Sequence, residues 1–155
     1  MQPRRSRKPK GRYLEHRASV RVRFQEVDSL QIVWHGHYLT YFEEARMAFG
    51  RKYGITYDDI RSAGLTAPVA HLSCDYLLPA RFDEELCVTA RLYARDSAKI
   101  EFYYEVSRAS DGALLATGET IQAFADPGGA LLLTMPEFMR EFYKRSEGEM
   151  RSDDG

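Results

Sequence analysis

An acidic residue and the predicted start of a helix lie near one another in the first third of the chain. Asp28 is predicted to end an alternating strand, and an apolar link, 32–34, joins it to a helix whose first turn is predicted near residues 35–38. The first backbone N–H groups of a helix have no partners within the helix and carry partial positive charge. They can hold a carbonyl oxygen that becomes an oxyanion. A carboxylate that faces such a site could serve acyl transfer.

Two histidines at the start of this helix raise the alternative of a metal site. His35 and His37 are separated by one residue, and His71 lies further along the chain. Zinc sites need three or four ligands that converge on one point, whereas side chains two residues apart on a helix point in different directions. The sequence therefore predicts no metal site here. It favours a role for the His35 side chain in lining a pocket.

The elements that must position these residues are indicated by the spacing of apolar side chains. Alternation predicts strands, a 3.6-residue spacing predicts helices, and glycine and proline mark their ends. A long helix is predicted over 38–53, with Gly54 as its C-cap. The other expected elements are a first strand over 17–24, a short helix over 57–62, strands over 69–78, 86–95, 99–106 and 113–125, a short strand over 131–133 and a terminal helix over 136–144.

This order of elements predicts an α+β fold. A curved antiparallel sheet would wrap around the long helix, with the apolar faces of both meeting in one core. Such a sheet has exposed edge strands, which can pair with another chain. Pairing of two copies would cover these edges, so we expect a symmetric homodimer.

Length and composition fit one domain outside the membrane. The chain has 155 residues, of which 44% are hydrophobic and 29% charged, and no apolar run is long enough to cross a bilayer. We expect a basic, disordered tail over 1–16, the folded domain over 17–145 and a polar tail over 146–155. The basic tail lacks the apolar core of a secretory signal, so a cytoplasmic location is expected. Its charge could attract nucleic acid, anionic lipid or an acidic carrier protein, but a disordered, solvated terminus is the favoured explanation, and we assign the tail no function and no nucleic-acid partner.

A longer motif around Asp28 resembles that of a known family. At matching spacing, Asp28 is followed by His35, Tyr38 and the run Phe42-Glu43-Glu44-Ala45-Arg46. The segments 76–83 and 111–126 look like a turn and the last long hairpin of the same pattern. In these features the chain resembles the hotdog-fold acyl-CoA thioesterases. Within this family it resembles the branch that contains hydroxybenzoyl-CoA thioesterase and the thioesterase associated with the Tol–Pal envelope system.

The resemblance implies roles for individual residues. Asp28 would be the catalytic carboxylate, acting as a general base on water or as a nucleophile through a mixed anhydride. The backbone N–H of His35 would donate to the oxyanion, and Gly36 would let the substrate approach the main chain closely. The substrate-binding residues would be Gln31, Val33, Trp34, Gly36 and Tyr38.

The same resemblance implies what the protein binds. The substrate would be an acyl thioester of coenzyme A or of an acyl carrier protein, held at the interface of a homodimer that could pair into a tetramer. Hydrolysis consumes only water, so no cofactor is implied.

Gln31 departs from the family pattern, in which many relatives have glycine three residues after the aspartate. If that glycine uses a positive φ angle, Gln31 must alter the local backbone or narrow the pocket. It could equally supply an amide that orients the attacking water. The sequence therefore predicts the reaction more clearly than the size of the substrate.

Alternatives remain open at this point. Asp28 could serve only as a cap for a turn or helix, and Glu43 more readily forms a structural pair with Arg46, three residues on, than a catalytic one. For the whole protein, one alternative is a hotdog hydratase or dehydratase, which typically pairs a catalytic histidine with an acidic residue at a different spacing. The other is a non-catalytic protein that binds acyl thioesters in a polyketide or fatty-acid pathway.

Overall fold

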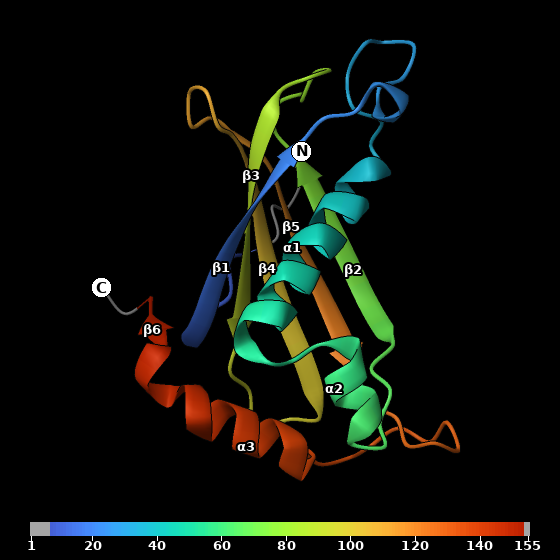
Figure 1. The fold of residues 1–155 in the computed structure, drawn as a ribbon, viewed down its shortest axis with the longest axis vertical. Coiled ribbons are helices and arrows are strands. Elements are labelled where there is room, and N and C mark those ends of the chain that lie inside the picture. Colours follow the sequence, from blue (N-terminus) through green and yellow to red (C-terminus); the bar gives the residue numbers. More distant parts are fainter. Residues whose placement is uncertain (1–6, 154–155) are drawn as a thin grey trace.

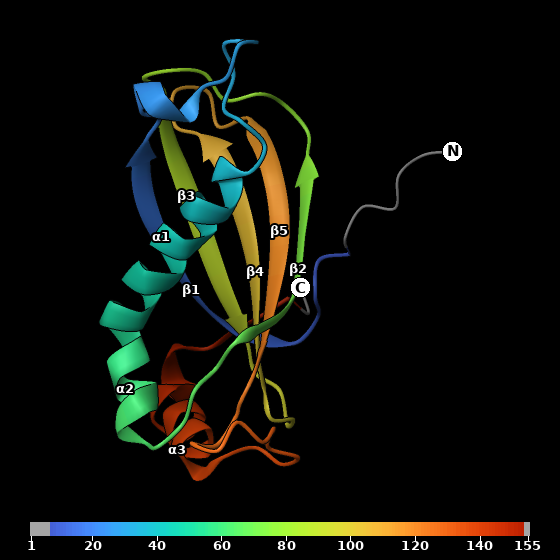
Figure 2. The ribbon, with the colours of Figure 1, turned by 90° about the vertical axis from the view of Figure 1, so that its right-hand side faces the viewer.

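The computed structural model describes residues 7–153, which form an antiparallel sheet with one long helix across one of its faces (Figures 1 and 2). The six strands lie in the order β2-β5-β4-β3-β1-β6. They are β1 (Arg12–Arg21), β2 (Val69–Tyr76), β3 (Glu85–Tyr93), β4 (Lys99–Arg108), β5 (Leu114–Ala123) and β6 (Arg151–Ser152). The helices are α1 (His37–Tyr53), α2 (Tyr57–Ser62) and α3 (Glu137–Ser146), with short 3-10 turns at Phe24–Glu26 and Glu147–Glu149.

Helix α1 forms where the apolar spacing predicts it. One face is buried, and its apolar members are Tyr38, Tyr41, Phe42, Ala45 and Phe49. The helix ends at Gly54, which has a φ of +76° and donates its N–H to the carbonyl oxygen of Gly50. Glycine adopts this left-handed conformation without the steric penalty of a Cβ atom, which explains why the helix ends there.

Aromatic rings fill the space between α1 and the sheet. Phe42 stacks on Tyr104 with ring centroids 4.6 Å apart, and Phe49 meets Phe102 edge-on at 5.0 Å. Gly118 of β5 leaves the room that Phe42 needs, because a Cβ atom at Gly118 would lie 2.3 Å from Phe42 Cε2. The small residue on the strand therefore sets how closely the helix approaches the sheet.

The N-terminal boundary of the domain differs from the prediction. β1 begins at Arg12 and pairs with β3 from Tyr13 onward, so residues 12–16 belong to the sheet and not to a disordered tail. Leu14 is fully buried, which gives this part of the strand an apolar anchor. Residues 1–6, which carry part of the predicted basic tail, lie outside the described range.

The C-terminal residues 146–155, predicted as a polar tail, also contain regular structure. Helix α3 extends to Ser146, and β6 then pairs with β1 at the edge of the sheet. Glu15 of β1 explains the attachment, since its side chain is 6% exposed and its Oε2 lies 3.4 Å from Nη1 of Arg151. The predicted strand over 131–133 forms only an isolated bridge between Ala125 and Leu131. No helix within residues 7–153 is long and apolar enough to cross a membrane.

Candidate active site

Asp28 lies in a tight loop beside the start of α1. A bridge joins Val27 to Val33 in antiparallel fashion, the Asp28 N–H donates to the carbonyl oxygen of Ile32 at 3.0 Å, and the Gln31 N–H donates to that of Asp28 at 2.9 Å. The prediction that Asp28 ends the first strand is wrong, because β1 stops at Arg21. The backbone of this short loop, rather than the sheet, fixes the position of the aspartate.

The carboxylate of Asp28 caps this loop and still has a free oxygen. Its Oδ1 accepts a hydrogen bond from the backbone N–H of Leu30 at 2.8 Å. Within residues 7–153, Oδ2 has no hydrogen-bond or ion-pair partner. The capping role weighed from the sequence is thus real, and it leaves one oxygen able to accept a proton or attack a carbonyl carbon.

Gln31 adopts the conformation that glycine would favour. Its φ is +63°, in the left-handed region, and its side chain is exposed. The loop therefore keeps a glycine-like backbone, and Gln31 bears the strain. This answers the question raised by its departure from the family pattern, because the backbone is not rerouted around the larger residue.

Replacing Gln31 by glycine should raise the free energy of unfolding by about 0.5–1 kcal/mol. A side chain in the left-handed region is disfavoured by about 1–2 kcal/mol, and part of this gain is offset because glycine makes the unfolded chain more flexible. Urea unfolding measures the change. Gln31→Ala is the matched control, since alanine shortens the side chain but keeps the Cβ strain. Equal stability of the two variants would contradict the explanation.

Helix α1 starts within the first turn predicted near residues 35–38. Gly36 is the N-cap and His37 the first helical residue, and the His37 N–H donates to the carbonyl oxygen of Trp34 at 2.9 Å. Within the described part of the chain, the backbone N–H groups of His35 and Gly36 donate to no protein atom. His35 is exposed. A free N–H at residue 35 has the properties needed for an oxyanion donor.

Trp34 occupies the space that Gly36 was expected to leave for the substrate. A Cβ atom at Gly36 would lie 2.1 Å from Cζ3 of the Trp34 indole. The indole also packs against both histidine rings, with centroids 4.8 Å from His35 and 5.5 Å from His37. Gly36 therefore makes room for Trp34. The indole is still 46% exposed, so its outer face is available as a wall for a bound group.

Val33 and Tyr38 lie behind this wall. Val33 is 3% exposed and Tyr38 is 2% exposed. Both are tied to Ala80, whose carbonyl oxygen accepts the Val33 N–H at 2.8 Å and whose N–H donates to the Tyr38 hydroxyl at 3.3 Å. Burial raises the pKa of the Tyr38 hydroxyl. In this chain the two residues support the loop from within the core.

Two residues that the sequence did not single out hold the site in place. Glu26 is 6% exposed, and its carboxylate accepts hydrogen bonds from the Arg23 N–H at 2.7 Å and the Tyr41 hydroxyl at 3.1 Å. Tyr76, at the end of β2, donates its hydroxyl hydrogen to the carbonyl oxygen of His35 at 2.6 Å. Desolvation raises the pKa of Tyr76, which keeps the phenol protonated as a donor at neutral pH.

Comparison with known proteins assigns the family. The family model described as the thioesterase-like superfamily matches residues 22–143. The chain belongs to that superfamily. The acyl-CoA thioester hydrolase YbgC of Escherichia coli is 23% identical over 108 residues, which cover 70% of this chain and 80% of YbgC. A putative esterase of Aquifex aeolicus is 36% identical over 86 residues, which cover 56% of this chain and 67% of the relative.

The fold is shared with solved thioesterases of this superfamily. The DHNA-CoA thioesterase from Staphylococcus aureus superposes with a TM-score of 0.76 at 23% identity, covering 86% of this chain and 91% of that protein. The predicted α+β hotdog fold is thereby confirmed. The family match and the relatives also confirm the prediction of a thioester hydrolase.

Tyr76→Phe should lower kcat about tenfold and leave the fold intact. The hydroxyl holds the carbonyl oxygen of His35, the residue whose N–H is the candidate oxyanion donor. A loosened donor loses part of its transition-state stabilisation, whereas removal of a whole donor costs about 10²–10³ in kcat. The measurement is steady-state hydrolysis of an acyl-CoA. Tyr53→Phe, which removes a phenol that donates to the carbonyl oxygen of Glu15 at 2.9 Å and lies outside the candidate site, is the control. An unchanged kcat for Tyr76→Phe would exclude the positioning role.

Proposed function

We propose that the protein hydrolyses acyl thioesters at the loop between Val27 and the start of α1, with Asp28 as the catalytic carboxylate and the His35 N–H as the oxyanion donor. The observation that carries this proposal is the coexistence, within residues 28–35, of a free carboxylate oxygen and a free backbone N–H at a helix start. The thiolate is a good leaving group, so one base or nucleophile and one oxyanion site suffice.

Two routes use the same residues. As a general base, Asp28 takes a proton from water while the water oxygen attacks the thioester carbon; the oxyanion is held by the His35 N–H, and its collapse expels the thiolate, which then takes up the proton. As a nucleophile, the Asp28 oxygen attacks the thioester carbon and expels the thiolate, and water then hydrolyses the mixed anhydride. Trapping a covalent adduct in single-turnover experiments with labelled water distinguishes the routes.

The acyl donor proposed is a coenzyme A thioester, with an acyl carrier protein as the second candidate. YbgC is named an acyl-CoA thioester hydrolase, and the 28% identical YneP of Bacillus subtilis a putative acyl-CoA thioesterase. These names favour coenzyme A. The similarity to YbgC also supports placement in the hydroxybenzoyl-CoA and Tol–Pal-associated branch, and we propose a cytoplasmic location.

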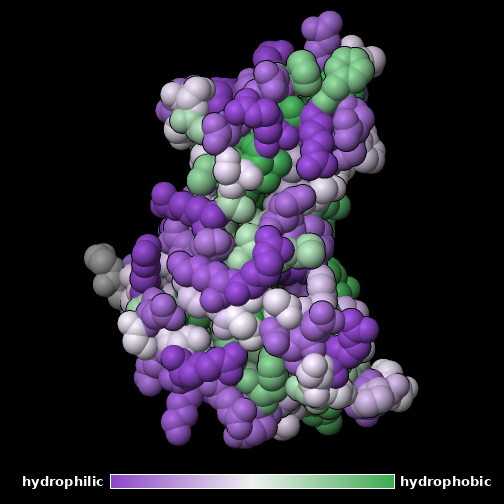
Figure 3. All heavy atoms as spheres, in the orientation of Figure 1, coloured by the Kyte–Doolittle hydropathy of each residue, from purple (hydrophilic) through white to green (hydrophobic). Residues whose placement is uncertain are grey.

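The working unit proposed is a homodimer formed through β2. This strand pairs only with β5 among the described strands, and it carries exposed apolar side chains at Val69, Leu72 and Tyr76. At the other edge of the sheet, β6 covers part of β1. The face shown in Figure 3 is mostly hydrophilic, with hydrophobic groups scattered between the polar ones. Sedimentation should give a species of twice the 17.8 kDa chain mass.

Release of free thiol from a panel of acyl-CoA and acyl-carrier-protein substrates tests the proposal. Thiol release supports hydrolysis and ranks the acyl groups and carriers. Hydration of an enoyl thioester without thiol release would instead identify a hydratase. Binding without turnover of any substrate would identify a non-catalytic acyl-thioester-binding protein.

A further inference from the structure

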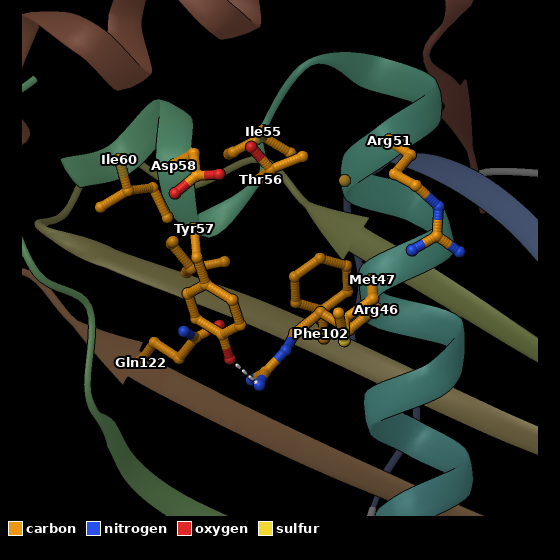
Figure 4. Close-up of a pocket in the computed structure, with 12 residues that line it drawn as sticks. Arg46, Met47, Arg51, Ile55, Thr56, Tyr57, Asp58, Ile60, Phe102 and Gln122 are labelled. Carbon is orange, nitrogen blue, oxygen red and sulfur yellow. Dashed lines mark hydrogen bonds between the residues drawn. The ribbon is translucent and has the colours of Figure 1, made fainter. Parts of the chain in front are cut away.

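A cavity lies between α1, α2 and the central strands, apart from the Asp28 loop (Figure 4). Its volume is about 370 Å³, which is room for roughly a dozen water molecules at ~30 Å³ each and lies within the range of small-molecule sites. Arg46 on its wall is nine residues beyond His37, or about 14 Å along the helix. We call it the Arg46 cavity. Its apolar lining consists of Met47, Gly50, Ile55, Ile60, Ile100 and Phe102.

Arg46 brings a buried positive charge to this apolar space. The residue is 8% exposed, and its Nη2 donates to the Glu43 carboxylate and to the Tyr57 hydroxyl (Figure 4). Its Nη1 is buried and has no hydrogen-bond partner within residues 7–153. A buried donor without an acceptor is unfavourable by about 1–3 kcal/mol, and by more when it is charged. The guanidinium of Arg46, which lines the cavity, is therefore only partly satisfied by its two protein partners.

The charges around the cavity favour an anionic ligand. Arg51 lies at the rim, and Asp58, which also lines the cavity, is paired with Arg61 of α2. Together with the pair of Arg46 and Glu43, these groups leave one positive charge in excess. The Tyr57 hydroxyl accepts from Arg46, so its own hydrogen is free to be donated to an anion beside the guanidinium.

We propose that the Arg46 cavity binds a free organic carboxylate with an apolar chain, about ten non-hydrogen atoms in all. The carboxylate would accept from the Tyr57 hydroxyl and lie beside the positive charge of the Arg46 guanidinium, and the chain would lie along Ile55, Ile60 and Phe102. Such an acid belongs to the class of product that thioester hydrolysis releases. The binding itself does not rest on the proposed function, because no residue of the Asp28 loop lines the cavity.

Titration with sodium octanoate and with 1-octanol tests this proposal. The two probes share an alkyl chain and differ in charge, so a site built around Arg46 should bind octanoate at least about tenfold more tightly. Calorimetry gives the affinities, and amide NMR shifts should move at Ile55 and Ile60. Repeating the titration with Asp28→Asn separates the two proposals, since octanoate binding should persist in a protein that cannot turn over substrate.

Variants decide which group recognises the charge. Arg46→Gln should remove the preference for octanoate, while Arg17→Gln, which changes an exposed arginine of β1 outside the lining, should keep it. Met47→Trp fills the cavity from a half-exposed position and should abolish binding even if Arg46→Gln fails to fold. Equal affinity for both probes, retained preference in Arg46→Gln, retained binding in Met47→Trp, or shifts confined to residues 28–37 would overturn the proposal.

Discussion

Asp28→Asn should lower kcat for thioester hydrolysis by about 10²- to 10⁴-fold and leave the fold unchanged. The asparagine side-chain oxygen can still accept the Leu30 N–H, so the loop cap survives the substitution. The amide, however, can neither take a proton from water nor attack the thioester carbon. The loss should therefore appear in turnover, while the free energy of unfolding changes by less than about 0.5 kcal/mol.

The matched control for this substitution is Asp83→Asn. Asp83 is also an aspartate in an exposed loop, and its φ of +66° resembles that of Gln31. It is paired with Arg21 at 3.8 Å and lies outside the candidate site. Its substitution should leave kcat within about twofold of the wild type, since surface changes of this kind are small. Near-wild-type hydrolysis by Asp28→Asn would remove Asp28 from the chemistry and leave it only the capping role.

Helix α1 and the long strands could be predicted because their residues follow the period of their own secondary structure. Tyr38, Phe42, Ala45 and Phe49 lie on one helical face, and Gly54 ends it with the φ that glycine permits. Local sequence is sufficient in such cases, because the same residues that define the period also make the core contacts. The motif that begins at Asp28 could also be recognised, since all of its residues lie in one continuous segment of the sequence.

The contacts that hold the site together could not be predicted, because they join residues far apart in the sequence. The Tyr76 hydroxyl reaches the carbonyl oxygen of His35 across 41 positions. Gln31 in the left-handed region runs against its own conformational preference, and only the loop closed by Val27 and Val33 imposes that conformation. Sequence patterns indicate the conformational preferences of residues, whereas the backbone conformation of this loop is imposed by the residues that it contacts.

The start of β1 was predicted five residues too late for a related reason. Residues 12–16 follow a basic run and include the charged residues Arg12 and Glu15, which is typical of a solvated tail. In the structure, the Glu15 carboxylate lies 3.5 Å from Nε of Arg91 and 3.4 Å from Nη1 of Arg151. A charge that is paired across strands is compatible with burial. A one-dimensional pattern cannot distinguish it from a charge in water.

Phe42→Ala should destabilise the protein by about 3–5 kcal/mol, the largest effect on stability that we expect. The ring is 1% exposed and stacks on Tyr104, so its removal leaves a cavity between α1 and the sheet that neither rigid element can close. Urea unfolding followed by circular dichroism measures the loss. A loss below about 1.5 kcal/mol would show that the helix can settle onto the sheet.

Gly118→Ala tests the same contact from the strand side. In the wild-type background the new methyl group would lie 2.3 Å from Phe42 Cε2. This overpacking should lower the free energy of unfolding by about 1–3 kcal/mol. With Phe42→Ala already present, most of that clash is gone, and only the approach to the Ser73 carbonyl oxygen at 2.9 Å remains. The double variant should therefore lose less free energy of unfolding than the sum of the losses in the two single variants. Losses that add within about 0.5 kcal/mol would mean that the two residues do not set the helix-to-sheet distance together.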